Sequence, residues 1–451
     1  MAEIRKIKNI VIGSGPSGRL GSLELGKLGE EVLLIEKKYI AGTCLNEGCM
    51  VVCALTDISR FLKNYKRFSD TLGFIKGDIE FDYAQAVLKV KETQQKLRYL
   101  NELENKGVNN EIIYGEADIK VEDDRIIVSV NVNDENNNPT GKIETFEAEN
   151  VLIATGGRPF IPDIKGSEFA LTSSDVLQLD EVPEKLNIIG GGIIAAELSN
   201  IFSSFSSNVK VIARSKVLKE IDEEFKGYLL EKFLGDVEFL EDTDVLEIKE
   251  NSVVTSKGEF EGKTLIATGR VPNSEIVEGI VELNDDKSIK VNEFSQTSNP
   301  HIYAAGDVTG GVTLTPVARK EGISAARNMA GYLNKLEEDI IPQSLTLDMD
   351  VSFIKRLKSA HEDREFIDIT IPGLGGPNAF WTLNETTGKT KVTLDKETGE
   401  IEKAISVSPS SVEASAYIAF LMNMGIKKED FDEFLEVHPS TDAYYKILKI
   451  L

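Results

Sequence analysis

The feature that most constrains the fold of this chain is a strand–glycine–helix unit that occurs twice, at residues 9–18 (NIVIGSGPSG) and 186–195 (LNIIGGGIIA). In each copy a short apolar run, typical of a buried parallel strand, leads into a glycine turn and then a helical segment. A second apolar strand follows each helix, at residues 31–35 and 209–212. Two such units predict an α/β protein with two Rossmann-like dinucleotide-binding domains.

The glycines of this unit have separate tasks. In the first copy Gly13 makes the tight turn, Gly15 lets the backbone approach a pyrophosphate, and Gly18 allows close helix packing. In the second copy alanine takes the third position, at Ala195. The helix that follows presents free N–H groups and its positive dipole end to the phosphates.

The residues after the second strand of each unit suggest which dinucleotides bind. Glu36 ends the first copy, and its carboxylate suits the unphosphorylated ribose of FAD or NAD. In the second copy Arg214 stands at this position, and Lys219 follows. Cations there suit a ribose 2′-phosphate, so NADPH is the expected nicotinamide cofactor, with NADH as the alternative.

The three cysteines, Cys44, Cys49 and Cys53, all lie in one ten-residue stretch. Structural disulfides in a large chain would be scattered to join distant segments, so this crowding predicts redox chemistry. A metal site would require a fourth soft ligand, and the chain has only three histidines. We therefore expect no metal. The spacing of Cys44 and Cys49 suggests that both lie at the start of one helix, where the dipole favours thiolate.

The charge of the chain excludes several classes of partner. It carries 51 basic and 75 acidic residues, for a formal net charge of −24. Such a surface repels nucleic acid and anionic membranes. The N-terminus shows no signal-peptide h-region, and no apolar run reaches membrane-spanning length, so a cytoplasmic location is expected.

Further motifs divide the chain. Val-Leu-Ile-Ala-Thr-Gly at 151–156 and Thr-Leu-Ile-Ala-Thr-Gly at 264–269 each predict a buried strand ending in a turn. From about residue 341 the pattern changes to alternating strands at 365–371 and 390–394, then a helix at 411–424, which predicts an α+β domain. The expected domains are 1–150, 151–272, 273–340 and 341–451.

The segment from Glu36 to Cys49 resembles the redox-active segment of the class I flavoprotein disulfide reductases, such as dihydrolipoamide dehydrogenase, glutathione reductase and mercuric reductase. Both Ala-Thr-Gly turns, Ala-Gly-Asp at 305–307, Leu-Thr-Pro-Val-Ala at 314–318 and the terminal His-Pro at 438–439 follow in the family's order. The resemblance implies an FAD domain with an inserted NAD(P) domain, a return to the FAD domain, and a C-terminal dimerisation domain. It also implies a homodimer whose active site uses residues of both subunits. Mercuric reductase is disfavoured, because a further C-terminal cysteine pair is missing.

The resemblance implies roles for four catalytic residues. Cys49 would face the flavin, Cys44 would exchange with substrate, and His438 would act as the base. Asp442 would take the place of the glutamate that orients this histidine, although the family has that acid one residue later, at Ala443 here. The glycine units and the resemblance together give these candidate cofactor-binding residues: Gly13, Gly15, Pro16, Ser17, Gly18, Glu36, Lys37, Gly42, Thr43, Ala117, Thr155, Gly156, Gly190, Gly192, Ala195, Glu197, Arg214, Lys219, Gly269, Gly306, Asp307, Leu314 and Thr315.

One substitution departs from the family pattern. Cys53 stands where a lysine normally pairs with the glutamate that corresponds to Glu197. Without that cation, the pKa of Glu197 should rise if the carboxyl group is buried. Cys53 lies one helical turn from Cys49, so the two should share a face. It is either a small buried residue or a third redox-active thiol.

The function expected from these features is that of an FAD-dependent NAD(P)H:disulfide oxidoreductase. Electrons would pass from NAD(P)H through FAD and the Cys44–Cys49 pair to a small-molecule or protein-bound disulfide. Two alternatives stay open: an NAD(P)H oxidase or diaphorase, and a non-catalytic flavin-holding redox sensor. The missing lysine and the shifted acid make the sensor plausible.

Overall fold

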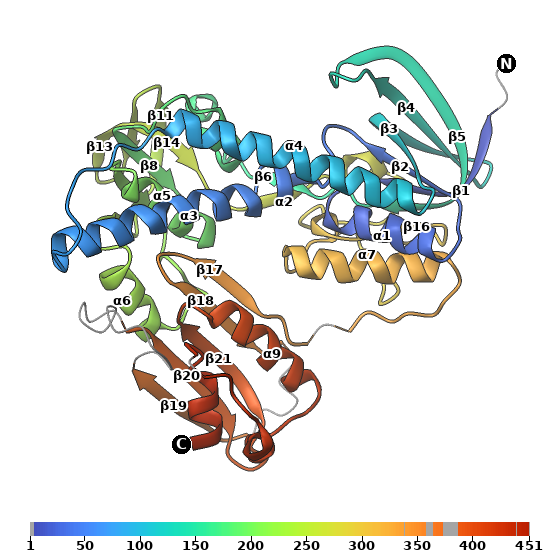
Figure 1. Ribbon diagram of the computed structural model, residues 1–451. Helices are drawn as coiled ribbons and strands as arrows, with labels where there is room; N and C mark the ends of the chain where they lie inside the picture. Colours follow the sequence, from blue (N-terminus) through green and yellow to red (C-terminus); the bar gives the residue numbers. More distant parts are fainter. Residues whose placement is uncertain (1–3, 338, 358–363, 373–386, 439, 451) are drawn as a thin grey trace.

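Two mainly parallel sheets and one antiparallel sheet form the centres of the fold (Figure 1). The computed structural model describes residues 4–337, 339–357, 364–372, 387–438 and 440–450. The predicted fold class, an α/β protein with Rossmann-like units and a C-terminal α+β unit, is confirmed. Within the described residues, no helix is long and apolar enough to cross a membrane.

The first sheet contains the first glycine unit. In it β1 lies between β2 and β5, β16 pairs with the other side of β5, and all of these pairs are parallel. The hairpin of β3 and β4 joins β2 to the start of β5. All five residues of β2 are buried, as expected for a strand covered on both faces. The strands are β1 (Arg5–Ile12), β2 (Val32–Glu36), β3 (Glu111–Glu122), β4 (Arg125–Asn133), β5 (Pro139–Ile153) and β16 (Ile302–Ala304).

The second sheet contains the second glycine unit, in the parallel order β10-β9-β8-β14-β7. A small antiparallel sheet of β11, β12 and β13 lies beside it. The strands are β7 (Leu171–Thr172), β8 (Lys185–Ile189), β9 (Asn208–Ile212), β10 (Glu238–Leu240), β11 (Val245–Lys249), β12 (Ser252–Thr255), β13 (Gly258–Glu261) and β14 (Lys263–Ile266).

A two-stranded ribbon marks where the chain leaves the first sheet and comes back. β6 (Gly157–Pro159) pairs antiparallel with β15 (Arg270–Pro272), so the two crossings lie side by side. The expected division at residue 150 lies inside β5, whose residues 151–153 still pair with β1 and β16. The first sheet therefore reaches Ile153 before the crossing.

The C-terminal unit is an antiparallel sheet in the order β17-β18-β21-β20-β19, with one long helix packed on it. The strands expected at 365–371 and 390–394 are present as β19 and β20. The helix expected to end at Gly425 is α9 (Ser411–Asn423), followed by Gly425 at φ 68°. The strands are β17 (Gln343–Thr346), β18 (Asp350–Lys355), β19 (Phe366–Pro372), β20 (Lys389–Asp395) and β21 (Ile401–Val407).

The remaining helices position the site. α3 and α4 extend between the first sheet and the second, and α7 lies against α1 (Figure 1). The helices are α1 (Pro16–Lys27), α2 (Gly42–Asn46), α3 (Cys49–Lys66), α4 (Tyr83–Gly107), α5 (Ile193–Ser204), α6 (Glu223–Lys232) and α7 (Thr315–Met329). Short 3₁₀ or π turns are η1 (Arg67–Thr71), η2 (Ser167–Phe169), η3 (Ser173–Gln178), η4 (Glu275–Val277), η5 (Asp307–Thr309), η6 (Lys428–Glu433) and η7 (Lys446–Ile450).

Candidate active site

The first glycine turn is shaped by contacts that exclude side chains at two positions and leave a third open. A Cβ at Gly13 would overlap the carbonyl oxygen of Ala154, and one at Gly18 would overlap that of Gly13. A Cβ at Gly15 would meet nothing within 4 Å. Gly15 caps the N-terminus of α1, and no side chain caps its free N–H groups. This end of the helix is therefore open to a phosphate.

Glu36 is held in place at the end of β2. Its Oε2 accepts hydrogen bonds from the backbone N (2.9 Å) and the hydroxyl (2.5 Å) of Ser14, and its Oε1 accepts one from the backbone N of Lys38 (2.7 Å). The carboxylate is buried, and Oε1, which accepts one hydrogen bond, retains lone-pair capacity for a ribose hydroxyl. Ser14, which the sequence did not single out, is the residue that orients Glu36.

The second glycine turn repeats this geometry. Gly190 has φ 133°, and a Cβ there would overlap the carbonyl oxygen of Ala267, while Gly192 is open. Beyond β9, Arg214 and Lys219 are exposed. Lys216, between them, is paired at 2.9 Å with both Glu241 and Asp242. Arg214 and Lys219 thus remain as candidate phosphate ligands.

The two predicted redox cysteines lie on different helices, which corrects the expectation of one shared helix. Cys44 lies in α2, and Cys49 is the first residue of α3. Gly48 separates the helices with φ −127° and ψ −121°, so the chain bends between the thiols. The bend brings the thiols within hydrogen-bond reach of each other. The Cys49 Sγ also lies 3.7 Å from the Thr315 hydroxyl of α7.

The hydrogen bond between the thiols divides their acidity. It is the main cause that lowers the pKa of Cys44 to about 6, with help from Thr315 and the charge of Arg319, while burial acts in the opposite direction. The same bond, together with burial, raises the pKa of Cys49. The reduced pair therefore loses its first proton more readily than an isolated thiol does.

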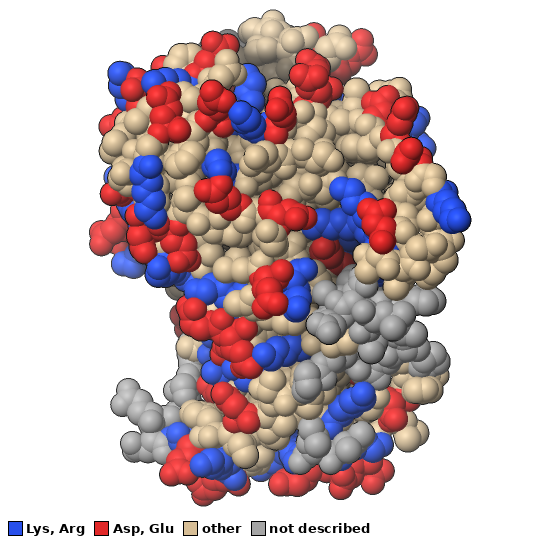
Figure 2. Space-filling model, turned by 90° about the vertical axis from the view of Figure 1, so that its left-hand side faces the viewer, with Lys and Arg blue, Asp and Glu red and all other residues tan. Residues whose placement is uncertain are grey.

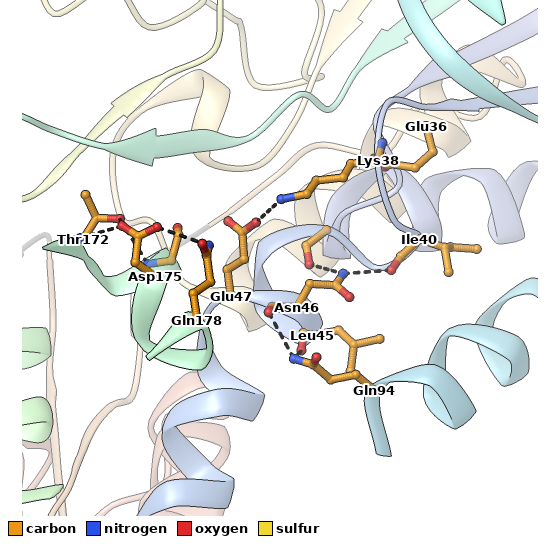
Figure 3. Close-up of polar contacts among 12 residues, drawn as sticks. Glu36, Lys38, Ile40, Leu45, Asn46, Glu47, Gln94, Thr172, Asp175 and Gln178 are labelled. Atoms are coloured by element: carbon orange, nitrogen blue, oxygen red, sulfur yellow. Dashed lines mark hydrogen bonds and ion pairs between the residues drawn. The ribbon is translucent and has the colours of Figure 1, made fainter. Parts of the chain in front are cut away.

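Polar contacts hold the cysteine segment against α4 (Figure 3). Gln94 of α4 donates to the carbonyl oxygens of Leu45 and Asn46, each at 3.0 Å. The Asn46 amide donates back to Ile40 at 3.1 Å and to Gly42 at 2.8 Å. Because these bonds fix the backbone on both sides of Cys44, the thiol pair is presented by a rigid loop.

Cys53 and Glu197 lie beside the pair. Cys53 is exposed to the cleft, so it is not the buried residue that one interpretation expected. Glu197 of α5 accepts a hydrogen bond from the backbone N of Thr346 at 2.8 Å. Burial, opposed by that bond and strengthened by Cys49, raises the pKa of Glu197 to about 7. The rise agrees with the loss of the cation that Cys53 replaces.

One cleft of about 1680 Å³ connects these features. It exceeds the volume that a single drug-sized ligand occupies, and it is long enough to reach both glycine turns and the thiols. Predicted residues that line it are Cys44, Cys49, Gly13, Gly15, Pro16, Ser17, Glu36, Lys37, Gly42, Thr43, Ala117, Thr155, Gly156, Gly192, Glu197, Gly269, Asp307, Leu314 and Thr315. Gly18, Gly190 and Gly306 make close backbone contacts behind it, Ala195 is buried in α5, and Arg214 and Lys219 lie outside its lining.

Sequence reasoning missed the partner of Asp307. The Arg270 Nε lies 3.5 Å from the Asp307 Oδ2, and both side chains line the cleft. Burial raises the pKa of Asp307, and Arg270 opposes that rise. Arg270 directly follows the second Ala-Thr-Gly turn, so a cation beside that motif was the available signal.

His438 and Asp442 are not brought to the thiols of the same chain. Neither lines the cleft, and His438 is exposed beside the exposed Leu435 and Val437. Asp442 accepts hydrogen bonds from the Tyr417 hydroxyl (2.5 Å) and the Tyr444 backbone N (2.8 Å). Among the described residues, the Asp442 carboxylate accepts these two hydrogen bonds, and its backbone N donates to the Ser440 hydroxyl at 3.0 Å.

Comparisons with known proteins agree with this geometry. The pyridine nucleotide-disulphide oxidoreductase family matches residues 7–322. A dihydrolipoyl dehydrogenase of Bacillus subtilis is 29% identical over 95% of both chains, and a glutathione reductase of Nostoc is 28% identical over 96% of both. The crystal structure of LpdA from Mycobacterium tuberculosis shares the fold, with a TM-score of 0.84, 22% identity, and coverage of 96% of this chain and 97% of that one.

Two dinucleotide-type glycine turns that open onto one cleft with a thiol pair define a class of protein: an oxidoreductase that couples a dinucleotide to sulfur chemistry. The chain belongs to the pyridine nucleotide-disulphide oxidoreductase family. It is a flavin-dependent enzyme that transfers electrons between a pyridine nucleotide and a disulfide.

Proposed function

We propose that Cys44 and Cys49 form the redox-active disulfide of this enzyme, and that the cleft delivers to it electrons from NAD(P)H. The observation that carries the proposal is the single cleft whose lining joins both glycine turns to the two thiols. Cys49, the first residue of α3, lines the cleft and would receive the electron pair there. Cys44 would form the mixed disulfide with substrate, in keeping with its lowered pKa.

The first sheet would hold FAD. The open backbone at Gly15, the uncapped N-terminus of α1 and the anchored Glu36 fit the pyrophosphate and the adenosine ribose. Asp307 would bind the sugar chain of the flavin, with Arg270 holding the carboxylate in place. A bound flavin would supply a planar acceptor between hydride and thiols. The second sheet, whose strands lie between β6 and β15 in the sequence, would hold the nicotinamide cofactor.

A second subunit would complete the site. His438 is exposed and lies away from the thiols of its own chain, so it is available to a partner molecule. The neighbouring Leu435 and Val437 are 86% and 80% exposed, an apolar surface that a dimer interface would cover. We propose a homodimer in which His438 takes the proton when the partner's exchange thiol is released. A cytoplasmic location suits cysteines that are confined to one redox-active segment.

Anaerobic titration tests this function. The purified protein should be yellow, and one equivalent of NADPH should reduce the disulfide and produce the long-wavelength absorbance of a thiolate beside oxidised flavin. Added disulfide should reverse the change and consume one equivalent of nicotinamide for each disulfide. A protein that is reduced by NAD(P)H but passes no electrons to any disulfide, or passes them only to oxygen, would contradict the proposal.

We further propose that NADPH is preferred, because Arg214 and Lys219 are exposed cations at the end of β9. Arg214→Glu should lower kcat/KM for NADPH by about tenfold or more, since a charge-assisted contact to the 2′-phosphate becomes a repulsion. The kcat/KM for NADH should change by less than about threefold. Lys216→Gln is the matched control, because Lys216 is already paired with two acids. If Arg214→Glu leaves the ratio of kcat/KM for NADPH to kcat/KM for NADH unchanged, the proposed preference is wrong.

A further inference from the structure

The affinity of this protein for an anionic dinucleotide has to come from local contacts. The net charge of the chain is −24, and over the face shown in Figure 2 acidic and basic side chains are interspersed. A protein of this charge does not attract a pyrophosphate at long range. One part of the cleft lining has no task in the electron path described above. It is the hairpin between β4 and β5, which contributes Asn131, Asn133, Asn137 and Pro139.

The hairpin belongs to the same sheet as the anchored Glu36, two strands away (Figure 1). Glu36 ends β2 and pairs with Tyr114 of β3. Two residues further along β3, Glu116 pairs with Asn131 of β4. A Cβ at Gly115 would overlap the carbonyl oxygen of Asn131, so this glycine lets β4 approach β3 closely. The hairpin and Glu36 therefore line neighbouring parts of the cleft.

Hydrogen bonds fix the tip of the hairpin. The Asn133 Nδ2 donates to the carbonyl oxygen of Lys37 at 3.0 Å and to the Asn137 Oδ1 at 2.8 Å. The Asp134 Oδ1 accepts two backbone N–H bonds within the turn, each at 2.9 Å. Asn137 has φ 65°, a left-handed conformation that asparagine tolerates better than most residues. The tip is thus closed on itself and tied to the residue that follows Glu36.

Two amide atoms at this tip have no hydrogen-bond partner within the described part of the chain. They are an acceptor, the Asn133 Oδ1, and a donor, the Asn137 Nδ2. Both side chains are half-buried and line the cleft. An acceptor beside a donor matches one edge of adenine, whose amino group donates and whose neighbouring N1 accepts. Ala117 and Pro139 add apolar surface to the same part of the lining.

We propose that Asn133 and Asn137 form a subsite for the adenine ring of the dinucleotide on the first sheet, so that the cofactor is selected by its base. This inference rests on the proposed binding of FAD there. A ribose bonded to Glu36 carries its base directly, so the base must lie next to that carboxylate. The hairpin is tied to Lys37, the next residue in the chain. Hypoxanthine has a carbonyl oxygen and an N1–H on this edge, so it reverses the pattern that the two amides match.

Competition for the flavin site of the flavin-free, full-length protein tests the subsite. Uptake of FAD is followed by flavin fluorescence, and ADP and IDP, which differ only in the base, compete with it. ADP should bind the wild type about tenfold more tightly than IDP. Asn137→Gly keeps the left-handed backbone and removes the amide. It should weaken FAD and ADP by about tenfold and IDP by less than about twofold.

Asn136→Gly is the matched control, because Asn136 lies in the same turn but is exposed and does not line the cleft. It should change none of the three affinities. Asn137→Asp keeps the acceptor for Asn133 and tolerates the same backbone, but its donor becomes an acceptor. It should shift the preference from ADP toward IDP, so the result does not depend on how glycine affects folding.

The outcomes separate two kinds of failure. If Asn137→Gly weakens FAD, ADP and IDP equally, the hairpin only supports the fold around the site, and the base-reading subsite is refuted. Equal competition by ADP and IDP in the wild type, or an unchanged ratio in both variants, refutes it as well. The reductase function stands in these cases if the FAD-loaded wild type still reduces a disulfide. If the folded protein takes up no FAD, the proposed function itself fails.

Discussion

Cys49→Ser is expected to abolish disulfide reduction, by more than about 10³-fold, while the protein still binds FAD and is still bleached by NADPH. Serine cannot form the disulfide with Cys44, so electrons reach the flavin and stop there. The long-wavelength absorbance seen in the wild-type titration should also be lost. Steady-state rates with a disulfide and an anaerobic NADPH titration of the same preparation measure both effects.

Cys53→Ser is the matched control, since it makes the same chemical change one turn along α3. Turnover should stay within about threefold of the wild type, because Cys53 lines the cleft without belonging to the hydrogen-bonded thiol pair. A loss comparable to that of Cys49→Ser, with a Cys49–Cys53 disulfide in mass mapping, would instead make Cys53 a third redox-active thiol.

The Cys49→Ser variant also tests the proposed dimer. Co-expressed with a His438→Ala chain, Cys49→Ser should recover activity, because a mixed dimer contains one site with both a complete thiol pair and a partner's histidine. Neither variant alone should show this recovery. If mixing restores nothing although mixed dimers are isolated, the histidine does not act across subunits.

The second large effect concerns two glycines of one motif. Gly18→Ala should destabilise the protein by about 3 kcal/mol or more, because the new Cβ would overlap the backbone carbonyl oxygen of Gly13. A backbone atom cannot move aside as the end of a flexible side chain can. Gly15→Ala should leave the fold intact, since its Cβ meets nothing within 4 Å and Gly15 has an ordinary φ of −61°. It should nevertheless lose FAD, because that Cβ points into the place expected for the pyrophosphate.

Thermal unfolding with and without added FAD separates the two effects. Gly18→Ala should unfold at a lower temperature in both conditions. Gly15→Ala should match the wild-type apoprotein, be isolated nearly colourless and gain little from added FAD. A Gly15→Ala protein that retains full flavin content would show that the pyrophosphate does not lie against this turn.

Local sequence patterns predicted much of the fold and part of the candidate site. The strand–turn–helix units, Gly13, Glu36 and the Cys44–Cys49 spacing each depend on residues within about 40 positions of one another, and periodicity and glycine chemistry report such short-range structure directly. The alternating strands of the C-terminal unit were predictable for the same reason. The substitution at Cys53 was also visible as a lost cation beside Glu197.

Tertiary structure alone decided how these pieces meet. The contact of Thr315 with Cys49, the hydrogen bond from Gln94 to the cysteine segment, and the one from Thr346 to Glu197 all depend on packing between segments far apart in the chain. Local propensity is blind to such contacts, because their free energy exists only once these segments have docked. The sequence by itself determined what chemistry the chain contains; docking of its segments determined which groups surround the thiols that perform it.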